Sequence, residues 1–168
     1  MKIGILGAGN IAGILAETMA QMPEVTCYAV SARDKNRAEA FRAAHGFQKA
    51  YGSYEEMLQD EEVELVYIAT PHSHHYEHMK LCISYGKPVL CEKAFTMNSK
   101  QAKEIARLAK EKGVYVAEAI WTRYMPSRKI INEVLASGVI GEVSMLTANL
   151  AYNIDENERI IRPELAGG

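Results

Sequence analysis

Cysteines, long apolar runs and excess charge are all scarce in this chain of 168 residues. The three cysteines, Cys27, Cys82 and Cys91, are odd in number and show no paired spacing, which favours a reduced, cytoplasmic protein. No uninterrupted apolar run approaches the roughly 18 residues of a membrane span. The N-terminus leads directly into an expected strand and leaves no room for a signal peptide.

The formal net charge of −2 gives no electrostatic reason to expect nucleic acid or an acidic membrane surface as a partner. The chain is 48% hydrophobic and 24% charged, which is typical of a globular protein with one good core and part of a second. There is no internal repeat beyond an alternation of strands and helices, and no low-complexity tract.

The glycine-rich stretch at residues 2–13 organises the chain. A short apolar run ends at Leu6, glycines follow at positions 7 and 9, and apolar residues then recur at helical spacing. Gly7 permits a tight turn, Gly9 lets the backbone approach a pyrophosphate, and Ala12 stands in the place of the third glycine. The first-turn N–H groups and the helix dipole would meet the phosphate charge. The order strand, glycine turn, helix therefore predicts dinucleotide binding.

Strands and helices alternate over residues 1–120. This alternation predicts an α/β fold with a doubly wound parallel Rossmann sheet of strand order 3-2-1-4-5-6, and a ligand at the carboxyl ends of the strands. Asp34, Ser53 and Asn98 or Ser99 are expected to cap helices, and one helix is expected to turn Ala102, Ile105, Ala106, Leu108 and Ala109 inward. The expected strands are 3–6, 25–30, 49–51, 63–69, 89–91 and 114–117.

The pattern changes after Trp121. A helix over 126–136 and one long strand over 142–153 are expected, and a single strand needs a pairing partner. We therefore interpret residues 1–120 as the dinucleotide-binding domain and 121–168 as a linker helix and the first strand of an incomplete α+β substrate or dimerisation domain. The residues from about 140 onward are expected to pack poorly or to pair with another chain.

The residues after the second expected strand bear on which dinucleotide binds. Ser31 stands where an NAD-binding chain carries an acidic residue, and Arg33 follows. A hydroxyl and a guanidinium suit the 2′-phosphate of NADP(H), so NADP is preferred and NAD is the second choice. Asp34 is better placed as a helix cap. In the alternative interpretation, Arg33 is only a solvated loop charge.

Four histidines, His72, His74, His75 and His78, lie within seven residues. His74 and His78 could share a helix face as two zinc ligands do, but no further ligand stands at a matching spacing apart from nearby Glu77, so no metal is predicted. In the favoured interpretation, the segment from Thr70 and Pro71 through His72 to His75 follows the fourth strand and contacts the cofactor. A solvated surface is the third possibility.

Glu92 and Lys93 follow the fifth expected strand at the same edge of the sheet. A lysine beside the nicotinamide, partly desolvated, could hydrogen-bond a substrate oxygen and take part in proton transfer during hydride transfer. An exposed ion pair is the ordinary alternative for this dipeptide.

Four ordered motifs together resemble the Gfo/Idh/MocA family of oxidoreductases, in particular the branch with dimeric dihydrodiol dehydrogenases and NADP-dependent D-xylose dehydrogenases. The motifs are Gly7-Ala8-Gly9-Asn10-Ile11-Ala12, Ala69-Thr70-Pro71-His72-Ser73-His74-His75, Cys91-Glu92-Lys93 and Glu118-Ala119-Ile120-Trp121-Thr122-Arg123. The resemblance covers essentially the whole chain. It departs at Ala94, where the family usually has proline, and the family continues past Gly168 into a mostly antiparallel sheet domain.

The resemblance implies that Lys93 is the catalytic lysine and that Glu92 lies near the nicotinamide. It also implies that Asn10 and Ile11 belong to the cofactor loop, that His75 is the family's histidine after the Thr-Pro loop, and that Trp121 and Arg123 line the cofactor cleft. Trp121 could instead be an interdomain core aromatic.

Three functions follow as hypotheses. The first is an NADP-dependent oxidoreductase acting on a sugar, polyol or cyclic diol, a homo-oligomer at full length and largely inactive as this polypeptide alone. The second is an NAD(P)-binding or sensing module without catalysis. The third, a metal-dependent hydrolase, is the weakest.

Overall fold

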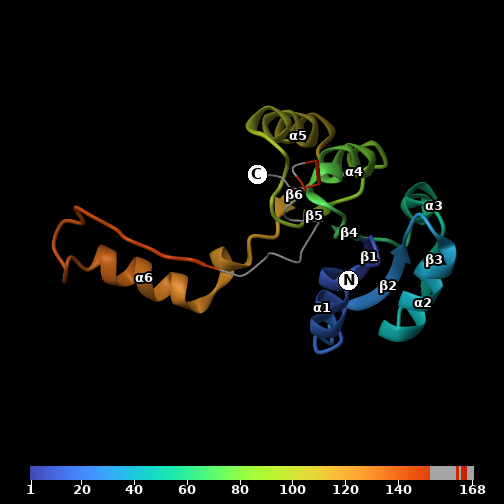
Figure 1. Cartoon of the computed structure of the whole chain (residues 1–168), viewed down its shortest axis with the longest axis horizontal. Helices are drawn as coiled ribbons and strands as arrows, with labels where there is room; N and C mark the ends of the chain where they lie inside the picture. The colour runs from blue at the N-terminus through green and yellow to red at the C-terminus, as the bar shows by residue number, and fades with distance from the viewer. Residues whose placement is uncertain (152–161, 163, 166–168) are drawn as a thin grey trace.

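A six-stranded parallel sheet forms the centre of the protein (Figure 1). The computed structural model describes residues 1–151, 162, 164 and 165. The strand order is β3-β2-β1-β4-β5-β6, and every neighbouring pair is parallel, which confirms the predicted doubly wound α/β fold. The strands are β1 Lys2–Leu6, β2 Thr26–Ser31, β3 Lys49–Tyr51, β4 Leu65–Ile68, β5 Val89–Cys91 and β6 Val116–Glu118.

Helices cover both faces of this sheet. The helices are α1 Asn10–Met19, α2 Lys35–His45, α3 Tyr54–Gln59, α4 His72–Ser84, α5 Ser99–Lys112, the 3-10 helix η1 Trp121–Tyr124, and α6 Pro126–Ala136. One core cluster packs α1 and the Phe41–Phe47 region against the sheet, and the other packs α3, α4 and α5 against it. In β1, Ile3 and Ile5 belong to the first cluster and Leu6 to the second, as expected for a strand buried on both faces.

Side-chain caps fix where three helices begin, as the sequence predicts. The side chain of Asp34 accepts from the N–H of Asn36, that of Ser53 from Glu56 and that of Asn98 from Gln101. These bonds satisfy N–H groups of the first helical turn that have no partner within the helix. The chain is thereby turned from one strand end into the next helix.

Two predictions about local structure are wrong. Ala106 of α5 is exposed, because the buried stripe of that helix runs through Ile105 and Ala109 and leaves position 106 outside it. Residues 142–151 form no strand, and 152–153 lie outside the described residues. The physical reason is that no strand among the described residues pairs with this segment, so its backbone groups have no ladder to join.

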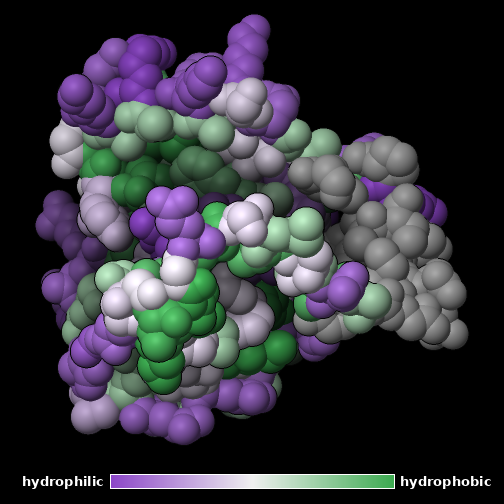
Figure 2. Space-filling view, turned by 90° about the vertical axis from the view of Figure 1, so that its left-hand side faces the viewer, coloured by the Kyte–Doolittle hydropathy of each residue, from purple (hydrophilic) through white to green (hydrophobic). Residues whose placement is uncertain are grey.

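The segment that follows β6 carries many exposed apolar side chains. No residue of α6 is buried, and Ile131 and Leu135 are exposed. Figure 2 views the side of the molecule from which α6 projects and shows apolar side chains on that surface. Within the described residues, no helix is long and apolar enough to cross a membrane.

Candidate cofactor site

The turn after β1 requires glycine at position 7. Gly7 has a φ of +100°, and its N–H donates to the carbonyl oxygen of Ser31 at 2.9 Å. A Cβ there would lie 3.1 Å from the carbonyl oxygen of Ala69. The left-handed backbone and this close approach both exclude a side chain. Without one, Gly7 can lie close to the carboxyl ends of both β2 and β4.

At the N-terminus of α1, no side chain competes for the first-turn N–H groups. Gly9 is its N-cap, no side chain caps the helix, and no acidic residue stands in its first turn. A Cβ at Gly9 would meet nothing within 4 Å, so the backbone faces open space there. Asn10 begins the helix at the surface, whereas Ala12 is fully buried against the sheet. This arrangement leaves first-turn N–H groups available for an anion such as a diphosphate.

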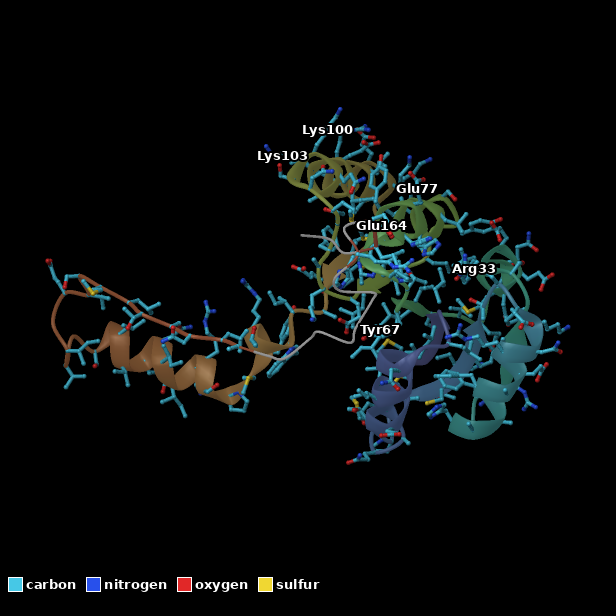
Figure 3. The ribbon with its side chains drawn as sticks, in the orientation of Figure 1. Arg33, Tyr67, Glu77, Lys100, Lys103 and Glu164 are labelled. Atoms are coloured by element: carbon cyan, nitrogen blue, oxygen red, sulfur yellow. The ribbon has the colours of Figure 1, made fainter. Side chains whose placement is uncertain are left out.

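A cavity of about 360 Å³ lies beside this turn. It brings together five of the predicted residues, Gly7, Gly9, Arg33, Thr70 and Pro71, and its other lining residues are Ala8, Ala32, Asp34, Arg37, Tyr54 and Ala69. Arg33 is exposed just after β2 (Figure 3). The cavity therefore places a guanidinium at the β2 side of the glycine turn, where the adenosine ribose of a dinucleotide would lie.

The structure places Ser31 differently from the sequence prediction. Its side chain is fully buried, and the hydroxyl donates to the carbonyl oxygen of Ile5 at 3.4 Å instead of lining the cavity. Ser31 is the last residue of β2 and is paired with Leu6 of β1 on one side and Tyr51 of β3 on the other, so its side chain is enclosed by the sheet and its covering layer instead of facing the cavity.

Arg37 is a site residue that sequence reasoning missed. Its Nε and Nη2 donate to the carbonyl oxygen of Ala8 at 3.1 and 3.0 Å, and it lines the same cavity as Arg33. Local spacing gives no signal for this role, because Arg33 precedes the α2 cap and the bond from Arg37 to Ala8 joins residues far apart in the sequence. Asp34 lies between them, with its Oδ1 accepting from the N–H of Asn36.

The four histidines of α4 have separate roles. His75 is fully buried, with its ring nitrogens 2.7 Å from the carbonyl oxygen of Ala94 and 2.8 Å from that of Thr70. It thus connects the loop after β4 with the loop after β5, and it does not line the cavities at this edge of the sheet. His72 lines a smaller cavity of about 70 Å³ with Ile11, Thr70, Glu92 and Lys93.

His78 supports the loop that begins at Thr70. Its Nδ1 lies 2.9 Å from the Thr70 hydroxyl, and its ring packs edge-on against Tyr54 with centroids 4.8 Å apart. Burial, with smaller contributions from the nearby charges of His74, His75 and Arg33, lowers the pKa of His78 to about 4. His74 instead contacts the hydroxyl of Ser73. Among the described residues, no three His, Cys, Asp or Glu side chains are grouped so as to hold a metal ion.

Glu92 and Lys93 follow β5 at the same edge of the sheet. The hydroxyl of Tyr67 donates to Glu92 Oε1, and the N–H of Lys93 donates to Oε2 at 3.1 Å. The Lys93 side chain is exposed. The reason is that Lys93 stands in a loop at the edge of the sheet, where neither face of the sheet covers it.

Trp121 and Arg123 lie in different places. Trp121 is 61% exposed and lines a cavity of about 480 Å³ that also contains Glu92 and Tyr67. Arg123 lines a separate cavity of about 680 Å³ along α6 and is not brought to the glycine turn. Both belong to η1, in which a turn takes about three residues, so side chains two positions apart point in different directions.

Parallel strands in this order, with a glycine turn leading into the N-terminus of α1, define a Rossmann dinucleotide-binding domain. Residues 1–120 match the family model GFO_IDH_MocA, described as an oxidoreductase family with an NAD-binding Rossmann fold. The chain belongs to this family, and it contains an NAD(P)-binding oxidoreductase domain.

Several known proteins are similar to the chain. It is 39% identical to trans-1,2-dihydrobenzene-1,2-diol dehydrogenase of Mus musculus and 36% identical to D-xylose 1-dehydrogenase (NADP(+)) of Hypocrea jecorina. Both alignments cover 100% of this chain, but 51% and 49% of those proteins. The chain thus spans about half the length of the curated relatives it matches.

Solved structures show the same likeness. An NAD binding oxidoreductase from Klebsiella pneumoniae matches with a TM-score of 0.78 and 31% identity, over 84% of this chain and 40% of that one. The 3-ketoreductase KijD10 from Actinomadura kijaniata in complex with NADP matches with a TM-score of 0.77 and 27% identity, over 84% of this chain and 45% of that one.

Proposed function

We propose that this protein is an NADP(H)-dependent oxidoreductase that acts on a hydroxyl or carbonyl group of a sugar, polyol or cyclic diol. The observation that carries the proposal is the cavity beside the glycine turn, in which the N-terminus of α1 and two guanidinium groups face one space. The names of the relatives support the substrate class, since they include a diol dehydrogenase and a xylose dehydrogenase.

The preference for NADP(H) over NAD(H) rests on the charges of this cavity. Arg33 and Arg37 can form charge-assisted hydrogen bonds to a ribose 2′-phosphate, whereas NAD(H) would need an acidic acceptor for its ribose hydroxyl. Asp34 is the one acidic side chain that lines this cavity, and one of its oxygens is occupied as the α2 cap. The balance of charge therefore favours the extra phosphate.

Lys93 is the residue proposed to act on the substrate. When bound, the nicotinamide supplies hydride transfer. The Lys93 side chain, which lines a cavity with His72 and Glu92, would hydrogen-bond the substrate oxygen. In the direction of oxidation its neutral amine would accept the hydroxyl proton as the hydride leaves the carbon, and in reduction the resulting ammonium would return that proton to the carbonyl oxygen. Glu92 would keep the loop of Lys93 in place through the bond from the Lys93 N–H.

Lys93→Ala tests this assignment. The assay uses the chain extended past Gly168, because this polypeptide alone is expected to be largely inactive. The substrates are a panel of sugars, polyols and cyclic diols with NADP(H), and turnover is followed at the absorbance band of the reduced nicotinamide. Loss of the proton-transfer group is expected to lower kcat about 100-fold or more. Lys103→Ala is the matched control, because Lys103 is an exposed lysine of α5 (Figure 3). Unchanged turnover in Lys93→Ala would contradict the assignment.

A second candidate function is an NAD(P)-binding or sensing module without catalysis. It is favoured by the exposure of Lys93, since a proton-transfer lysine is usually enclosed with its substrate. Cofactor binding together with no turnover of any substrate in the panel by the chain extended past Gly168 would support this module, and substrate-dependent turnover would exclude it.

A further inference from the structure

The carboxylate of Glu92 is held in a fixed position at the junction of two cavities. Oε1 accepts from the Tyr67 hydroxyl and Oε2 from the Lys93 N–H, so both oxygens have a donor. Glu92 lines the small cavity with Ile11 and Thr70, and it also lines the larger one with Trp121. Tyr67 is only 3% exposed within β4, which makes it a rigid anchor for the carboxylate.

The negative charge of Glu92 is not neutralised by an ion pair. Among the ion pairs formed by described residues, none includes Glu92, and the Lys93 Nζ is not within ion-pair distance of it. Burial, and then the hydrogen bond to Glu92, raise the pKa of Tyr67 above its usual range, so its hydroxyl stays a donor. A neutral donor orients the carboxylate and leaves its charge in place.

Glu92 lies in the half of the sheet that would receive the nicotinamide. A doubly wound sheet consists of two mononucleotide-binding halves, and the cavity of Arg33 and Arg37 occupies the half with β2. The other half contains β4 and β5, and Glu92 directly follows β5. Oxidised nicotinamide carries a positive charge, and reduced nicotinamide does not.

We propose that Glu92, oriented by Tyr67, makes this site bind the oxidised cofactor in preference to the reduced one, with Tyr67 as the positioning residue. The inference rests on the proposed function, because it requires NADP(H) in the cleft. A partly exposed carboxylate near a unit positive charge is expected to change the ratio of the two affinities about tenfold. A tenfold preference lowers the potential of the bound two-electron couple by about 30 mV.

The test is to measure the dissociation constants of NADP+, NADPH and 2′,5′-ADP by calorimetric titration of the whole chain. The variants are Glu92→Gln, which removes the charge, and Tyr67→Phe, which removes only the hydroxyl. Glu61→Gln is the control, because Glu61 is an exposed carboxylate in the loop before β4, at the opposite end of that strand. The readout is the ratio of the NADPH constant to the NADP+ constant.

Glu92→Gln is expected to lower this ratio about tenfold and Tyr67→Phe about threefold, because a released carboxylate keeps its charge but not its orientation. The double variant should have the same ratio of the two constants as Glu92→Gln, and Glu61→Gln should have the same ratio as the wild type. The 2′,5′-ADP constant should be unchanged in all of them, which would show that each variant folds with the half of the site that binds adenosine intact.

A ratio unchanged in Glu92→Gln or in Tyr67→Phe, with 2′,5′-ADP still bound, would overturn this inference alone. Absence of all binding to the wild type would instead overturn the proposed function, and this inference with it.

Discussion

Arg33 and Arg37 stand four residues apart and are expected to have different effects on the cofactor. Arg33 lines the cavity with its side chain exposed, whereas Arg37 also holds the carbonyl oxygen of Ala8 with two hydrogen bonds. Arg33 is thus placed to recognise a phosphate alone, and Arg37 additionally supports the glycine turn. Sequence reasoning selected Arg33 and missed Arg37, because the bond to Ala8 depends on the packing of α2 beside the turn.

Arg33→Ala should weaken NADP(H) binding about 10- to 100-fold and leave NAD(H) binding nearly unchanged, because hydrogen bonds to a charged group contribute about 1.5–3 kcal/mol. Arg37→Ala should weaken the binding of both cofactors, since the glycine turn loses two hydrogen bonds to the Ala8 carbonyl oxygen. Arg42→Ala, whose side chain pairs with Glu39 further along α2, is the control and should change neither. The measurement is titration with each cofactor. Equal losses for NADP(H) and NAD(H) in Arg33→Ala would contradict phosphate recognition.

His78 makes the stability of the folded chain depend on pH. Its pKa is lowered to about 4 from an ordinary value near 6.5, so between these values the unfolded chain binds a proton that the folded chain does not. The contribution of His78 to stability is therefore fully present above about pH 6.5 and is lost as the pH falls toward 4. His78→Asn, which keeps a polar group near the Thr70 hydroxyl, should flatten this decline. Urea unfolding of both proteins at several pH values checks it, and parallel declines would refute the role of His78.

At the scale of elements, the turn from β1 to α1 assigns different roles to its two glycines. Gly7 needs its positive φ and has Ala69 close by, whereas Gly9 has an extended backbone with a φ of −110° and open space around it. The first glycine serves the fold, and the second keeps the approach to α1 clear.

Gly7→Ala should lower the free energy of unfolding by about 1–2 kcal/mol or more, because an alanine is strained at this φ and its Cβ meets backbone. Gly9→Ala should leave stability within about 0.5 kcal/mol of the wild type but weaken cofactor binding, since its methyl group would occupy the approach to the first-turn N–H groups. Denaturant unfolding and cofactor titration of both variants separate the two effects. Equal destabilisation by the two substitutions would argue against this division.

The elements themselves could be predicted from sequence wherever local signals and the sheet agree. Asp34, Ser53 and Asn98 cap helices as expected, because a cap depends on neighbours within a few residues. Residues 142–151 alternate like a strand yet form none, because a strand exists only when another one pairs with it. The prediction for Ser31 is wrong for a similar reason, since the burial of a side chain at a strand end depends on the strands beside it.

In the molecule as a whole, some apolar residues are buried in the core and others are exposed, and the two groups differ in what they contribute to stability. Leu58 is 1% exposed within the core cluster of α3, α4 and α5, whereas Leu135 of α6 is 44% exposed. The stability of the described protein therefore comes from the sheet and the helices that cover it, and α6 contributes little.

Leu58→Ala should lower the free energy of unfolding by about 2–5 kcal/mol, because it leaves a cavity in a close-packed core. Leu135→Ala removes the same atoms from an exposed helix and should change stability by less than about 0.5 kcal/mol. Urea unfolding of the two variants beside the wild type makes the comparison. A large loss in Leu135→Ala would mean that α6 is packed against a surface in solution.

The cleft between the glycine turn and the two arginines is expected to bind NADP(H). Calorimetric titration of the unmodified chain with NADP+ and with NAD+, in the same buffer, tests it most directly. The predicted result is one binding site per chain for NADP+, with NAD+ bound at least about tenfold more weakly, as loss of charge-assisted bonds to the phosphate implies. No binding of either dinucleotide, or tighter binding of NAD+, would contradict it.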